Sequence, residues 1–454
     1  MRSRLSILLL LAVPLVVVAK VHEHRLDNGL RIIVKEDHRA PIVASQIWYR
    51  VGSSYEPVGV TGVSHVLEHM MFKGTEKLAP GEFSRIIAAN GGRENAFTSR
   101  DYTAYHQMLA RDRLEVAFEL EADRMRNLLL PADEFAKEVQ VVMEERRLRT
   151  EDKPASLTYE QLSAVAYRSL PYGNPVIGWM ADLENMEVDD LKHWYNLYYA
   201  PNNATLVVVG DVVPAEVVAL AERHFGPLKA EPVPRQKPLR EPRQRGVTRV
   251  TVRAPATEPY LIFGFKTPVI GTAAEEWEPY ALEMLASVLD GGGSARFSRN
   301  LVRGSQVAVS ADADYSAFTR LPGMLLVDGT PAPGHDIVAL EKALFGEIER
   351  LKREPVEERE LARIRAQVVA GKVYELDSVY YQAVQIGRLV SIGLDWRLAD
   401  DYVERIRQVT AEQVQAVARK YLTEENMTLA VLDPLPLDRK PQSGSLKGGD
   451  HGRH

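Results

Sequence analysis

Hydrophobic and polar positions predict two helices in the first half of this chain. The first lies around residues 61–74, where Thr61 and Ser64 can cap its start and Gly74 can end it. The second runs over about residues 131–149. Their apolar positions are Val66, Leu67, Met70, Met71 and Phe72 in the first helix, and Phe135, Val139, Val142 and Met143 in the second. Each helix is therefore expected to be a packed, rigid element.

A helix, a short turn and a buried strand occur twice along the chain. Residues 181–211 and 404–434 align without gaps at an offset of 223. The matching pairs are Tyr198 with Tyr421, Asn203 with Asn426, Thr205 with Thr428, Leu206 with Leu429, and Val208 with Val431. This pattern favours an internal duplication over two unrelated helix–strand units.

The segment 227–246 separates the two copies. It holds five prolines among many charged residues, which is typical of an extended linker with little core of its own. The chain of 454 residues is also longer than one core usually fills. We therefore predict an N-terminal half over residues 20–226, a C-terminal half over 247–437, and a disordered polar tail over 438–454.

The first residues are typical of a targeting segment. Arg2 and Arg4 precede an apolar run over residues 5–18, and Val17-Val18-Ala19 resembles a small-residue cleavage site. The run is shorter than the roughly 20 residues that span a bilayer, so a signal peptide over 1–19 is favoured over an uncleaved membrane anchor. We expect a periplasmic or secreted protein with no stable membrane span.

The composition of the chain argues against some classes of binding partner and against disulfide bonds. The net charge of −6 is small for this length and indicates neither nucleic acid nor a polyanionic partner. The sequence contains no cysteine, so a disulfide framework is excluded. Hydrophobic residues make up 45% of the chain, as in ordinary globular proteins.

The first helix carries the residues with the clearest chemistry. His65 and His69 lie one turn apart, and Glu68 falls on the same side, so all three can address one point. This arrangement is typical of a zinc hydrolase, although two surface histidines would give the same pattern. A catalytic zinc needs a third protein ligand and an open position for water. The second helix offers the candidate carboxylates Glu134, Glu138, Glu144 and Glu145, of which Glu138 and Glu145 share a face.

With these residues the chain resembles the pitrilysin or insulinase family of zinc metallopeptidases, the inverzincins, and bacterial homologues of the mitochondrial processing peptidase. The family signature is His-x-x-Glu-His followed some 75 residues later by a glutamate, and Glu145 lies 76 positions beyond His69. The resemblance implies one Zn²⁺ per chain, bound by His65, His69 and Glu145. It makes Glu68 the catalytic base and Glu138 a supporting acid. Glu144 remains the competing third ligand.

Other motifs in the first half fit the same family in the same order. They are Leu26-Asp27-Asn28-Gly29-Leu30, the run HMMFKGT over residues 69–75, Gly91-Gly92, and Asn95-Ala96-Phe97-Thr98. In the family the last segment is a sheet edge beside the metal, so the resemblance implies that the substrate adds there as a strand, on Asn95, Ala96 and Phe97. The alternative is an ordinary buried strand.

The resemblance also implies a fold of class α+β, with two homologous α/β-sandwich halves that enclose a peptide like a clamshell. The linker 227–246 would be the hinge. The second-half counterpart of the metal helix, over residues 280–289, contains no histidine, so only the first half can hold zinc.

The second half departs from the family at two positions. In the second half of many family members, an Arg and a Tyr bind the substrate and stabilise the oxyanion. The matching positions of this chain are Val302 and Val309. Arg303 and Tyr315 are possible shifted substitutes, although their spacing is wrong. The favoured explanation is a homologous partner subunit that supplies the missing pair in a heterodimer, with a homodimer as the alternative.

These residues lead to one favoured function and two alternatives. We expect a zinc endopeptidase that acts on short or unfolded peptides, needs a partner chain for full activity, and uses Glu68 to move the proton of the metal-bound water. The alternatives are a non-catalytic peptide-binding or assembly subunit of the same fold, and a small-molecule metallohydrolase. The ligand set also suits manganese or cobalt.

Overall fold

A computed structural model describes residues 20–437. The predicted signal peptide over 1–19 and the predicted tail over 438–454 lie outside the described residues. Within the described range, no helix combines the length and the apolar character needed to cross a bilayer.

Six strands of the first half form one mixed sheet in the order β1-β2-β6-β3-β5-β4. Its strands are β1 (Val21–Arg25), β2 (Arg31–Glu36), β3 (Ile42–Tyr49), β4 (Arg93–Thr98), β5 (Thr103–Ala110) and β6 (Ala204–Gly210). The pair β2 and β6 is parallel, and the other neighbours are antiparallel. Strand β4 therefore forms an edge of the sheet.

Five strands of the second half form a second mixed sheet in the order β7-β11-β8-β10-β9. Its strands are β7 (Thr248–Pro255), β8 (Tyr260–Thr267), β9 (Ala308–Asp314), β10 (Gly323–Pro331) and β11 (Met427–Leu435). The pair β7 and β11 is parallel, as β2 and β6 are in the first sheet. Without β1, the two sheets have the same order and the same strand directions, which is what an internal duplication predicts.

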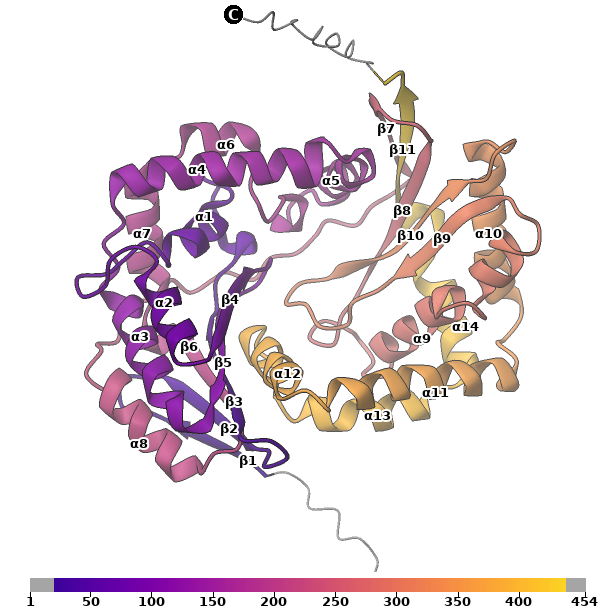
Figure 1. Cartoon of the computed structure of the whole chain (residues 1–454). Coiled ribbons are helices and arrows are strands. Elements are labelled where there is room, and N and C mark those ends of the chain that lie inside the picture. The colour runs from indigo at the N-terminus through magenta and orange to yellow at the C-terminus, as the bar shows by residue number, and fades with distance from the viewer. Residues whose placement is uncertain (1–19, 438–454) are drawn as a thin grey trace, which may run out of the picture.

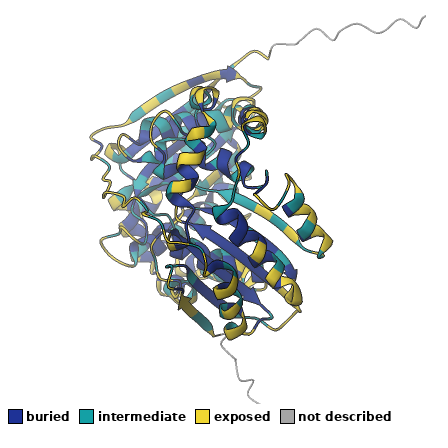
Figure 2. Cartoon of the chain, turned by 90° about the vertical axis from the view of Figure 1, so that its left-hand side faces the viewer, coloured by how far each residue is buried: buried dark blue, intermediate teal, exposed yellow. Residues whose placement is uncertain are grey.

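Helices cover both sheets. In the first half they are α1 (Val63–Met70), α2 (Glu82–Ala89), α3 (Leu114–Arg126), α4 (Ala132–Arg146), α5 (Pro154–Ala166), α6 (Met180–Asn185), α7 (Val188–Tyr198) and α8 (Pro214–Phe225). In the second half they are α9 (Glu278–Asp290), α10 (Ile337–Arg353), α11 (Glu358–Glu375), α12 (Val379–Ser391), α13 (Leu398–Gln408) and α14 (Ala411–Tyr421). Buried residues follow the strands, and the outward faces of the helices are exposed (Figure 2).

The two halves exchange one helix each (Figure 1). Helix α12 of the second half packs on the first sheet, where Ala383 and Ile386 join a core with Trp48 and Val207. Gly387 permits this contact, because a Cβ there would lie 2.1 Å from the Trp48 ring. Helix α5 of the first half packs on the second sheet in the same way. There Leu162 packs against Ile262 and Ala430. Each sheet is thus covered on one face by its own half and on the other by a helix of the opposite half.

A buried ion pair also joins the halves. Arg320, in the connection between β9 and β10, reaches Asp101, in the turn between β4 and β5, with Nε 3.3 Å from Oδ1. The Arg320 backbone N–H donates to the other carboxylate oxygen, and its guanidinium donates to Ser54 at 2.7 Å. The Tyr172 hydroxyl also donates to Asp101. The Asp101 carboxylate is therefore held by residues of both halves.

The linker between the halves is extended but fastened at several points. Residues 227–246 contain no helix or strand. Glu231 and Asn202 exchange two hydrogen bonds at 3.0 and 2.8 Å. Glu241 accepts hydrogen bonds from the backbone N–H groups of residues 168–170 and from Lys266. Burial alone would raise the pKa of Glu241, but these donors outweigh it and lower the pKa to about 2.

Replacing Glu241 by Gln should destabilise the protein at neutral pH by about 1–3 kcal/mol, the usual worth of hydrogen bonds to a charged group. Because the folded pKa lies below the ordinary value of 4.5, this stability is present above about pH 4.5 and is lost as the pH falls toward 2. Urea unfolding at pH 7 and at pH 3 measures it. The difference between parent and variant should shrink at pH 3, and an equal difference at both pH values would contradict the account.

Candidate metal centre

Helix α1 presents its two histidines on one face and its apolar residues on the other. Val66, Leu67 and Met70 are fully buried in the core of the first half. The rings of His65 and His69 lie on the opposite side, with their centroids 4.9 Å apart. The predicted caps are wrong, because Thr61 and Ser64 make no side-chain bond to the start of the helix. The buried carboxylate of Glu56 instead accepts the backbone N–H groups of Gly62 and Ser64, at 2.7 and 2.9 Å.

Helix α4 brings a carboxylate to the two rings. One oxygen of Glu145 lies 3.8 Å from His65 Nε2, and the other lies 3.5 Å from His69 Nε2. One donor atom from each residue lies within 4.8 Å of the others. Glu144, the competing ligand, points to solvent and pairs with Arg147 at 3.1 Å. Two imidazole nitrogens and one carboxylate oxygen are a donor set that fits a zinc ion and leaves a position open.

Glu138 lies behind His69, about two helical turns before Glu145 on the same face of α4. Its Oε2 is 3.1 Å from His69 Nδ1, and its Oε1 is 2.5 Å from Lys73 Nζ. A proton on Nδ1 then donates to Glu138 and leaves Nε2 free for a metal. Lys73 had no role in the sequence interpretation, although it lies in the HMMFKGT motif.

Glu68 points to the same region and is hydrogen bonded by the edge strand. Thr98 Oγ1 donates to Glu68 Oε2 at 2.5 Å. Burial raises the pKa of Glu68, and the Thr98 bond and His69 oppose this rise only in part. Burial, His69 and Arg149 together lower the pKa of His65 to about 3. His65 is therefore neutral, as a metal ligand must be, at all physiological pH values.

Strand β4 supplies an open edge beside these residues. Asn95, Ala96 and Phe97 pair with β5 on one side, and no described strand pairs with their other side. The alternative of an ordinary buried strand is therefore wrong. Phe97 packs edge-on against Trp48, with centroids 5.4 Å apart, whereas Thr98 faces the metal helix.

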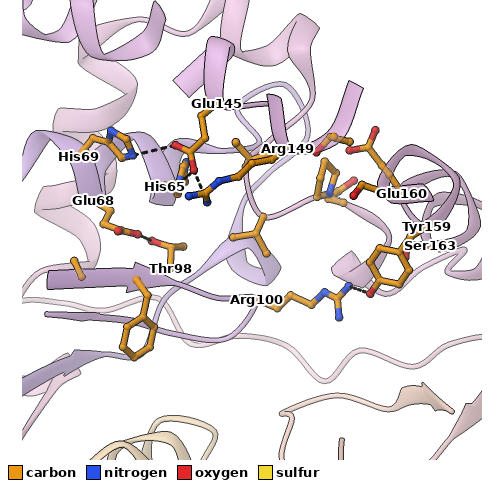
Figure 3. Close-up of a pocket in the computed structure, with 18 of the residues that line it drawn as sticks. His65, Glu68, His69, Thr98, Arg100, Glu145, Arg149, Tyr159, Glu160 and Ser163 are labelled. Carbon is orange, nitrogen blue, oxygen red and sulfur yellow. Dashed lines mark hydrogen bonds and ion pairs between the residues drawn. The ribbon is translucent and has the colours of Figure 1, made fainter. Parts of the chain in front are cut away.

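A cavity of about 670 Å³ contains the three donor residues and runs along β4 (Figure 3). Its other charged lining residues are Glu68, Arg100, Arg149 and Glu160. The sequence interpretation did not include the two arginines. Arg149 follows Glu145 by four residues, so its helical position could have indicated it. Nothing in the local sequence marks Arg100.

The residues considered as shifted substitutes for the family's Arg and Tyr lie elsewhere. The Tyr315 hydroxyl donates to the carbonyl of Pro268 at 2.7 Å, and the Arg303 guanidinium donates to the carbonyl of Gly293. Within residues 20–437, neither side chain lines the cavity of the metal centre. Val309, at the family's Tyr position, is exposed on β9.

Comparison with known proteins agrees with this geometry. Residues 31–179 match the family model described as insulinase (peptidase family M16), and residues 185–368 match the model described as peptidase M16 inactive domain. The chain is 31% identical to the zinc protease PqqE of Helicobacter pylori over 90% of its own length and 92% of that protein.

A second zinc protease and a solved structure are also similar to this chain. The chain is 26% identical to the uncharacterized zinc protease YmxG of Bacillus subtilis, over 91% of this chain and 98% of that one. The crystal structure of a protease from Helicobacter pylori superposes with a TM-score of 0.87 at 30% identity, covering 92% of this chain and all of that one. This chain therefore belongs to the insulinase family of zinc proteases, peptidase family M16.

Proposed function

We propose that this chain is an endopeptidase in which His65, His69 and Glu145 bind one zinc ion and Glu68 is the catalytic base. The observation that carries the proposal is the convergence of two imidazoles and one distant carboxylate, with a buried acid beside them, at an open strand edge. A non-catalytic subunit of the same fold has no need to keep all four groups together. The two large halves also fit a peptide better than a small molecule.

Each residue then has one task in peptide hydrolysis. Zinc held by His65, His69 and Glu145 would lower the pKa of a water and polarise the scissile carbonyl. Glu68 would take the proton of the attacking water and deliver it to the leaving amine. Thr98 fixes the orientation of the Glu68 carboxylate at 2.5 Å. The open edge of β4 along Asn95, Ala96 and Phe97 binds the backbone of the substrate as an added strand.

We further propose that residues 20–226 and 247–437 act as two domains joined by the linker 227–246, and that a partner chain completes an enclosed chamber. Two observations support a partner. Neither Arg303 nor Tyr315 lines the cavity. The fold of this chain also matches only 47% of the length of the periplasmic protease PqqL from Escherichia coli, at 17% identity and a TM-score of 0.76. The partner is a homologous chain or a second copy, and the chain acts after export to the periplasm.

Chelation and metal replacement test the proposal. A chelator should abolish the cleavage of an unfolded polypeptide, and stoichiometric zinc should restore it. Manganese and cobalt in parallel show which divalent ion serves best. Cleavage should be slow for the chain alone and should rise on addition of a homologous partner, because an oxyanion donor is worth about 10²-fold or more in rate. Cleavage that survives complete metal removal would contradict the proposal.

Replacing Glu138 by Gln should weaken zinc binding by about 10- to 100-fold, because the anion that holds His69 Nδ1 is lost while the ligands remain. Competition with a chelating dye measures the affinity. Glu134→Gln is the matched control, since Glu134 lies on the same helix and contacts Lys73 but no histidine. Equal affinity in the two variants would show that Glu138 does not support the site.

A further inference from the structure

Arg100 is a half-buried cation that lines the cavity without a carboxylate of its own. Its Nη2 donates to the Tyr159 hydroxyl at 2.9 Å, and its guanidinium lies 5.3 Å from the centroid of the Tyr172 ring. Within residues 20–437 it forms no ion pair. The neighbouring Asp101 is already bound by Arg320 and Tyr172. Removing a guanidinium from bulk water costs free energy unless an anion lies beside it. This position therefore favours a ligand that carries an anionic group.

Arg149 is a second cation in the same cavity. It lies in the π-helix Arg147–Glu151 that follows α4, and its Nη1 is 2.5 Å from Glu145 Oε1. That oxygen belongs to the proposed metal ligand, so a divalent ion there competes for the one carboxylate with which Arg149 pairs among residues 20–437. The Arg149 side chain is 70% exposed and lines the cavity beside Glu145 (Figure 3).

The acids that line the cavity do not compensate these two cations once a metal is bound. Glu160 is neutralised by Arg146 through two hydrogen bonds of 2.8 and 2.9 Å. Glu68 and Glu145 face the metal centre, where a divalent ion balances both. The metal-loaded cavity is therefore positive, and the uncompensated charge sits on Arg100 and Arg149.

We propose that this cavity selects peptides with an acidic side chain near the scissile bond, and that Arg100 is the residue that binds the carboxylate. The inference rests on the proposed peptidase function. Arg100 lies two residues beyond Thr98, which touches Glu68. Arg100 lies in the turn just after the end of β4, and its guanidinium lines the same cavity as the metal donors, so it can reach a side chain of the added strand near the scissile bond. Arg149 adds to the positive field at the metal end.

Matched peptides test the proposal. Each set contains three fluorescent peptides that are identical except for Glu, Gln or Lys at one position. One set is made for each of the three positions on either side of the cleaved bond. At one position the Glu peptide should have a kcat/KM about 10-fold above that of the Gln peptide, as expected for a charge-assisted hydrogen bond. Arg100→Gln should bring this ratio to within about 2-fold, and Arg100→Lys should retain part of it. Arg93→Gln, at an exposed arginine that begins β4, should leave it unchanged.

Binding separates this inference from the proposed function. Fluorescence anisotropy with the zinc-loaded Glu68→Gln variant measures the same Glu-to-Gln ratio as a Kd, without cleavage. If the parent chain cleaves no peptide even with a homologous partner added, the proposed function fails, and the binding ratio still decides the inference. A parent ratio near one, a preference for Lys, or a ratio that Arg100→Gln leaves at about 10-fold would overturn it. In the last case Arg100 only supports the tyrosines around it.

Discussion

Replacing Glu68 by Gln should reduce kcat by about 10²- to 10⁴-fold, the usual contribution of a general base, and should leave zinc in place. Glutamine has the shape of glutamate, so its amide oxygen can still accept the hydrogen bond of the Thr98 hydroxyl. An amide, however, cannot accept a proton from water. The side chains of the proposed ligands are untouched. Metal content by atomic emission and steady-state cleavage of an unfolded polypeptide are the two measurements.

Glu144→Gln is the control for this result. Glu144 immediately precedes Glu145 but points to solvent, so its variant should keep both zinc and activity. His69→Ala should lose both, because a proposed ligand is removed. An active Glu68→Gln variant with bound zinc would show that another group carries the proton.

Replacing Arg320 by Ala should destabilise the protein by about 3 kcal/mol, at the lower end of the usual cost of breaking a buried ion pair. The variant leaves the carboxylate of Asp101, only 3% exposed, without its cation. It also removes the guanidinium that lies 4.4 Å from the Tyr55 ring and bonds Ser54. Urea unfolding followed by circular dichroism should show the loss.

Arg243→Ala provides the matched comparison. Arg243 also joins distant parts of the chain, pairing with Glu425 at 3.2 Å, but both side chains are more than 60% exposed. An exposed pair is worth about 0–1 kcal/mol, so this variant should unfold almost like the parent. Similar stabilities for the Arg320 and Arg243 variants would contradict a structural role of the inter-half ion pair.

The sequence predicted the metal helix well because its information is local. Helical spacing alone places His65, Glu68 and His69 on one side of α1, and the apolar residues on the other. The pairing of Glu145 with these histidines was implied by family resemblance, since no local pattern tells which of the four glutamates on α4 reaches α1. The structure distinguishes Glu145 from Glu144 by direction, with one facing the rings and the other facing solvent.

Contacts between distant segments could not be predicted from the sequence. Periodicity shows that one face of α5 or α12 is buried, but not that the covering sheet belongs to the opposite half. The cap of α1 is a similar case. Thr61 and Ser64 fit the local pattern, but backbone N–H groups at the start of the helix donate to the buried carboxylate of Glu56, which lies in a preceding turn. The Arg320 contact with Asp101 spans more than two hundred residues and leaves no local signal.

Diffraction from zinc-loaded crystals above and below the zinc absorption edge tests the central claim most directly. We predict one anomalous peak per chain, bonded by Nε2 of His65, Nε2 of His69 and the Glu145 carboxylate, at the distances of about 2.0–2.2 Å usual for zinc. A peak held by other residues, or no peak between α1 and α4, would contradict the account.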